Sequence, residues 1–173
     1  MIEVIGYLVE FVAVFIGVIA AFELDKRRET RHEETERRRL LGLLRKEIEA
    51  DVLIMDQILT GLLSIPNAVP YQSLRLEIWQ GITGKLDIFN DDILLEKIAR
   101  FYYRLNLLGR TLDIYLDHAS SYTFLTTSAN QPHVENLLTF HKDTIKSLIG
   151  NKDQGLVRLA QETVNAIDLA LRD

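Results

Sequence analysis

The feature that most constrains this chain is an apolar run over residues 4–24, VIGYLVEFVAVFIGVIAAFEL. Only Glu10 and Glu23 interrupt it, and about 20 apolar residues are what a helix needs to cross the hydrocarbon layer of a bilayer. A cleaved signal peptide begins with positive charge, whereas here the positive charges follow the run. We therefore predict a transmembrane helix over residues 1–24, with a buried core helix as the alternative.

The charges beside this run predict its orientation. Only three residues precede it, and four basic residues follow it closely: Lys26, Arg27, Arg28 and Arg31. Basic residues next to a single span stay on the cytoplasmic side of the membrane. We therefore expect the N-terminus outside the cell membrane and the rest of the chain in the cytosol. The same four side chains are candidates for contacts with anionic lipid headgroups.

Small residues recur along one line of the predicted span. In alternating steps of three and four, this line carries Glu3, Gly6, Glu10, Ala13, Gly17, Ala20 and Leu24. A seven-residue repeat keeps one helix face turned toward a neighbour, and small residues let helices pack closely inside a membrane. The seam of small residues, defined as Gly6, Ala13, Gly17 and Ala20, predicts a homo-oligomer or another membrane protein as partner.

Two carboxylates, Glu3 and Glu10, lie on the same line as the seam. A charged residue at membrane depth is costly, and it normally faces the interior of a helix bundle or a water-filled cavity. Two interpretations stay open. A ring of Glu10 residues from several copies could line a cation-conducting pore. Alternatively, Glu10 is structural, hydrogen-bonded between helices or placed near the outer interface.

The remainder of the chain is predicted to be all-α. Residues 25–39 contain neither Pro nor Gly and favourable pairs such as Glu33 with Arg37, which indicates a charged helical linker that continues the span. Apolar residues resume at position 40, so we expect the first helix to reach about residue 63. Turn and cap residues predict further helices over about 73–89, 90–125, 132–150 and 156–171. Residues 40–173 are thus expected to form a cytosolic antiparallel helical bundle.

Composition and motifs narrow the classes of function. The chain has no cysteine, which excludes disulfides, thiol catalysis and cysteine-ligated zinc. A net charge of −5 argues against nucleic acid as a partner. Around Gly81 and Gly84 the glycine spacing of a phosphate-binding loop is missing, and the histidines lack the spacing of metal ligands on one helix face. We expect no enzymatic activity, no cofactor and no metal site.

Part of the chain resembles a known pattern. Residues 10–59 are similar to small uncharacterised prokaryotic single-pass membrane proteins, in which an N-terminal apolar helix leads into a charged helix. The residues that carry the resemblance are Gly17, Glu23, Asp25, Leu40, Leu41, Leu44 and Glu47. The resemblance implies an anchor followed by a helical body, and it implies no activity and no site residues.

Taken together, these patterns favour a self-associating single-pass membrane protein that acts as a scaffold, sensor or accessory subunit. A homo-oligomeric cation-conducting pore lined by Glu10 is the first alternative. The second is a membrane-tethered enzyme without a recognisable motif. Membrane lipid and a second membrane protein chain are the expected partners.

Overall fold

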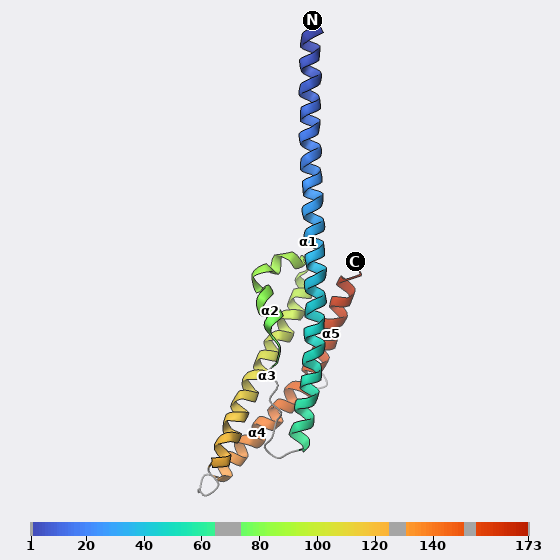
Figure 1. Cartoon of the computed structure of the whole chain (residues 1–173). Coiled ribbons are helices and arrows are strands. Elements are labelled where there is room, and N and C mark those ends of the chain that lie inside the picture. The colour runs from blue at the N-terminus through green and yellow to red at the C-terminus, as the bar shows by residue number, and fades with distance from the viewer. Residues whose placement is uncertain (1, 65–73, 125–130, 151–154, 173) are drawn as a thin grey trace. The chain divides into compact units, whose positions relative to one another are not determined.

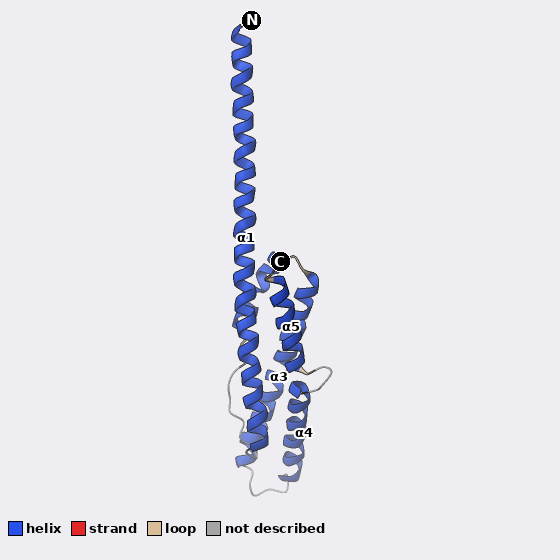
Figure 2. Cartoon of the chain, turned by 90° about the vertical axis from the view of Figure 1, so that its right-hand side faces the viewer, coloured by secondary structure: helices blue, strands red, loops and turns tan. Residues whose placement is uncertain are grey.

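The structure is a computed structural model that describes residues 2–64, 74–124, 131–150 and 155–172 (Figure 1). These ranges contain helices and no strand (Figure 2), so the all-α prediction is confirmed. The elements in chain order are α1 (Ile2–Ser64), α2 (Glu77–Ile82), the 3-10 helix η1 (Thr83–Phe89), α3 (Asp92–Phe124), α4 (Gln131–Gly150) and α5 (Leu156–Ala170).

The chain divides into two compact units, Met1–Arg39 and Leu40–Asp173. In the first unit, residues 15–35 are exposed on every side of the helix. Among the described residues, no helix is apolar over enough of its length to cross a membrane. The side chains of residues 1–14 lie outside the described part, so the transmembrane assignment of residues 1–24 stays a prediction.

One hydrophobic core fills the second unit. The stripe on α3 is fully or almost fully buried, as its seven-residue spacing indicates: Leu94, Ile98, Phe101, Leu105, Leu108, Leu112 and Tyr115. Helix α3 packs against both α4 and α5. The part of α1 after residue 40 turns a matching face inward, with Leu41, Leu44, Ile48, Met55 and Ile58 buried. These faces follow the helical period, which is why apolar spacing predicts them.

The segment between α1 and α3 differs from the single helix expected over residues 73–89. Residues 74–76 are not helical, α2 is six residues long, and η1 is kinked at Lys85 (φ −134°, ψ 28°). Gly81 and Gly84 flank this change, and glycine weakens a helix interior by about 1 kcal/mol. The start of α3 also differs in detail. Asn90 is left-handed (φ 46°), and Asp91 is the residue that caps α3, accepting the N–H of Leu94 at 2.9 Å.

Candidate functional site

Two carboxylates are buried inside the helical bundle. Glu47 is 4% exposed and Asp51 is 0% exposed, although Asp and Glu are almost never fully buried without partners. They lie four residues apart on α1, so both project from one face of that helix. Residues 75–79 and Tyr102 of α3 supply hydrogen-bond donors to this pair. We call Glu47, Asp51 and Tyr102 the buried acidic centre.

Glu47 caps the N-terminus of α2 from a different helix. The first N–H groups of any helix lack partners within it, and the residue at the N-cap position, Leu76, has no polar side chain to supply one. The N–H of Ile78 donates to Oε2 of Glu47 at 2.9 Å, and the N–H of Trp79 donates to Oε1 at 3.4 Å. The Tyr102 hydroxyl donates to the same Oε1 at 2.7 Å. This carboxylate thus ties α1, α2 and α3 together.

The carboxylate of Asp51 has fewer hydrogen-bond partners than that of Glu47. The N–H of Arg75 donates to its Oδ1 at 2.8 Å, whereas the buried Oδ2 finds no hydrogen-bond partner among the described residues. Burial raises the pKa of Asp51 from 3.8 to about 7, because the charged form loses its hydration. The Arg75 N–H lowers this pKa, and the charge of Glu47 raises it further. Asp51 therefore changes its charge near neutral pH.

Aromatic rings cover the buried acidic centre. Trp79 stacks on Tyr102, with ring centroids 5.0 Å apart and planes 3° from parallel. Phe101 meets Tyr102 edge to face, with centroids 5.2 Å apart. Burial raises the pKa of Tyr102 far above its usual range, and the hydrogen bond to Glu47 adds to this effect. The hydroxyl consequently stays protonated and remains a donor to Glu47.

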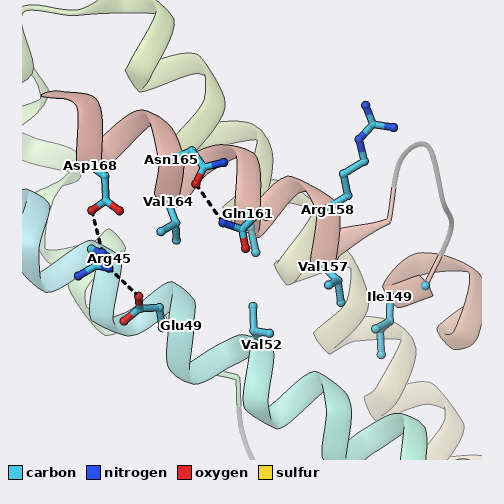
Figure 3. A pocket seen from close by; sticks show the side chains of 12 residues that line it. Arg45, Glu49, Val52, Ile149, Val157, Arg158, Gln161, Val164, Asn165 and Asp168 are labelled. Carbon is cyan, nitrogen blue, oxygen red and sulfur yellow. Dashed lines mark hydrogen bonds and ion pairs between the residues drawn. The ribbon is translucent and has the colours of Figure 1, made fainter.

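A second candidate region is a groove of about 770 Å³ between α1, the end of α4 and α5 (Figure 3). Its walls include Val52, Val157 and Val164. Across one end of it, Arg45 Nε lies 2.9 Å from Asp168 Oδ1, and Arg45 Nη2 lies 3.2 Å from Glu49 Oε1. The first of these is an ion pair without the alignment of a hydrogen bond. The positive charge of Arg45 is thus already neutralised by ion pairs with two carboxylates. The remaining surface of the groove is mainly apolar.

The sequence-predicted residues that the structure describes all lie on α1 within the first unit, and none of them belongs to the buried acidic centre. Gly17 and Ala20 of the seam are exposed, and no described atom lies within 4 Å of the position where a Cβ of Gly17 would stand. The four basic residues Lys26, Arg27, Arg28 and Arg31 are also exposed. Glu3, Gly6, Glu10 and Ala13 belong to the helix, but their side chains lie outside the described residues.

The sequence reasoning missed the buried acidic centre. A signal for it was present, because Glu47 and Asp51 fall at helical spacing on the same face as the buried Leu44 and Met55. A carboxylate on an apolar helix face indicates either a functional group or a buried cap. An analysis that considers only the apolar residues of a helix face does not detect such a carboxylate. Among the described residues, no cluster of three or more His, Asp or Glu side chains is arranged to hold a metal ion.

A pair of histidines joins α3 to α4 elsewhere in the bundle. The rings of His118 and His141 stack with centroids 5.3 Å apart and planes 19° from parallel. Burial lowers the pKa of His141, and the charge of His118 lowers it further. The folded protein therefore binds fewer protons here than the unfolded chain, and this contribution to stability is lost as the pH falls below about 6.5.

Replacing His141 by glutamine is expected to flatten this acid response. Between about pH 7 and about pH 5, wild type should lose on the order of 1–3 °C more of its melting temperature than the variant. Thermal unfolding followed by circular dichroism measures the difference. His133→Gln, an exposed site on the same helix, is the control and should behave as wild type. An equal acid response in H141Q and wild type would exclude a role for the stacked pair.

No protein-family model, curated protein or solved structure matches this chain significantly.

Proposed function

We propose that this chain is a membrane-anchored, non-enzymatic protein that self-associates through its N-terminal helix and presents a cytosolic helical bundle as a scaffold, sensor or accessory subunit. The observation that carries this proposal is the exposure of large apolar side chains all around residues 15–24. Six of them are between 46% and 72% exposed: Phe15, Ile16, Val18, Ile19, Phe22 and Leu24.

Water is a poor environment for such a helix. Each Å² of apolar surface left in water costs about 25 cal/mol, and a helix that is hydrophobic all round is normally buried in a protein or a membrane. Lipid covers every side of a helix at once, whereas a partner protein covers one face. The exposed basic residues that follow, Lys26 to Arg31, suit the anionic headgroups of a cytoplasmic leaflet. Both features support an anchor with the bundle in the cytosol.

Self-association is supported by the way small and large residues are distributed around this helix. Gly17 and Ala20 share one line, and Gly17 leaves open space beside the backbone. Large residues such as Ile16, Val18 and Ile19 occupy the other faces. In lipid, close packing replaces the hydrophobic effect as the force that joins helices. The seam of small residues is therefore the face on which a second copy of the helix fits.

Membrane extraction and cysteine labelling test the anchor and its orientation. We expect the full-length protein to stay with the membrane fraction at alkaline pH and to leave it only in detergent. Because the chain has no cysteine, single cysteines report topology cleanly. Ile2→Cys should react with a membrane-impermeant maleimide in intact cells, and Arg172→Cys only after lysis. Release by alkali would rule out the anchor, and the reverse labelling pattern would rule out the orientation.

A pair of substitutions to leucine tests the seam. Ala20→Leu is expected to weaken the assembly by on the order of 1–3 kcal/mol, because the larger side chain keeps the two helix backbones apart. Val18→Leu is the control, since Val18 points about 100° away from Gly17 and about 160° away from Ala20 around the helix. Light scattering in mild detergent, with the detergent mass subtracted, gives the protein mass of each complex. Equal losses in both variants, or none in A20L, would contradict the seam.

A further inference from the structure

The start of α2 and the residues just before it are hydrogen-bonded to side chains of α1. Three main-chain N–H groups of residues 75–79 donate to the carboxylates of α1, one to Asp51 and two to Glu47. Helix α2 has six residues, and so short a helix is not stable by itself in water. The position of this segment therefore depends on the two carboxylates together with the packing of Leu76, Ile78 and Trp79 against the core.

Opposing effects act on the charge of Asp51. The N–H and the positive side chain of Arg75 favour the ionised carboxylate, whereas burial disfavours it. The negative charges of Glu47, one turn away on α1, and of Glu77, at the start of α2, also disfavour it. Burial is the largest of these effects. Within the described part of the chain, Tyr102 of α3 also faces this site, stays protonated and donates to Glu47.

We propose that Glu47 and Asp51 form a proton-binding latch, which holds residues 75–79 against the bundle while the pair carries a proton and releases them when both carboxyls are ionised. Two like charges one helical turn apart in a buried site are unfavourable. Moving residues 75–79 away would let water reach both carboxylates and relieve this cost. The latch lies wholly within the second unit, and it does not depend on the membrane anchor proposed above.

The pH range of the latch follows from Asp51. Its pKa is raised from 3.8 to about 7 in the folded protein. Between these two values the folded state holds a proton that the unfolded chain has lost, so stability falls as the pH rises through this range. Above the midpoint, each pH unit raises the ratio of ionised to protonated Asp51 tenfold. The latch is thus closed in mildly acidic solution and opens on the alkaline side of neutrality.

Trp79 provides a direct reporter of the latch. It is the single tryptophan of the chain, it lies in the held segment, and its ring stacks on Tyr102. We would record tryptophan emission and acrylamide quenching of the full-length protein in mild detergent, from about pH 5 to about pH 9. As the pH rises, the emission should shift to longer wavelength and quenching should increase, with a midpoint near pH 7.

Asp51→Asn is the decisive variant. Asparagine has the same size, keeps an oxygen for the Arg75 N–H, and cannot ionise. The variant should keep the short-wavelength emission of the closed latch at every pH. Asp56→Asn, an exposed aspartate further along α1, is the matched control and should titrate as wild type does. A wild type without a transition, or the same transition in D51N, would overturn the proposal.

A direct titration covers the case in which D51N fails to fold. Carbon NMR of the Asp51 carboxyl in the wild-type protein gives the pKa of that group without any substitution at the site. A midpoint near 7, matching the fluorescence transition, would support the latch. A midpoint near the ordinary 3.8 would overturn it, because Asp51 would then be ionised across the whole physiological range and could not hold the latch closed.

Discussion

Replacing Glu47 by alanine is expected to destabilise the bundle by about 3 kcal/mol or more. The change leaves the Tyr102 hydroxyl and the N–H groups of Ile78 and Trp79 without their acceptor. Each buried polar group that loses its partner costs about 1–3 kcal/mol. Relief of the repulsion on Asp51 offsets part of this loss. Because whole domains are stable by only about 5–15 kcal/mol, the effect should be plain in urea unfolding followed by circular dichroism.

The matched control for this variant lies two residues further along the same helix. Glu49 is exposed and pairs with Arg45 at the surface, and surface ion pairs contribute about 0–1 kcal/mol. Glu49→Ala should therefore unfold within about 0.5 kcal/mol of wild type. If the two alanine variants lost equal stability, the capping of α2 by Glu47 would contribute nothing beyond an ordinary surface carboxylate.

Phe101→Ala is the second change for which we expect a large effect, a loss of about 3–5 kcal/mol. Phe101 is 0% exposed, and it meets the ring of Tyr102 edge to face. Its removal forfeits apolar burial and opens a cavity that the surrounding helices fill only in part. The measurement is again urea unfolding, with the midpoint and slope fitted together so that a change in the unfolded state is recognised.

Tyr103 makes a stringent control for Phe101 because it is an aromatic residue of the same helix. It is 74% exposed, so Tyr103→Ala should change the free energy of unfolding by under about 0.5 kcal/mol. A large loss in Y103A would mean that this face of α3 is covered in solution by a second copy or another protein. Losses of under about 0.5 kcal/mol in both F101A and Y103A would contradict the position of the core on α3.

The long helices of the bundle agree well with the ranges predicted from the sequence. The stripe from Leu94 to Tyr115 on α3 is buried as its period indicates, and α1 runs to Ser64 as the absence of proline indicates. These features are local, since spacing along one helix decides which face is apolar. Where local signals competed, prediction was less accurate. Asn90 and Asp91 are both good cap residues, and the structure uses Asp91 as the cap while Asn90 takes the left-handed turn.

The buried acidic centre could not be predicted in the same way. The hydrogen bond between Glu47 and Tyr102 joins residues 55 positions apart, and no local pattern specifies such a pair. The predicted start of the helix that precedes α3, at about residue 73, lies outside the described part. The described start of α2 is capped by Glu47, a carboxylate from another helix. A polar residue on an apolar face is ambiguous until its partners are known.

By itself, the sequence determined the helical class, the long helices of the bundle and the faces that they bury, because periodicity and breaker residues act over a few neighbouring positions. It also determined an apolar, cysteine-free N-terminal helix followed by basic residues. Only the tertiary structure decided that Glu47 caps α2, that His118 stacks on His141, and that burial raises the pKa of Asp51 to about 7. These properties depend on desolvation and on contacts between distant parts of the chain, and both exist only once the helices have packed.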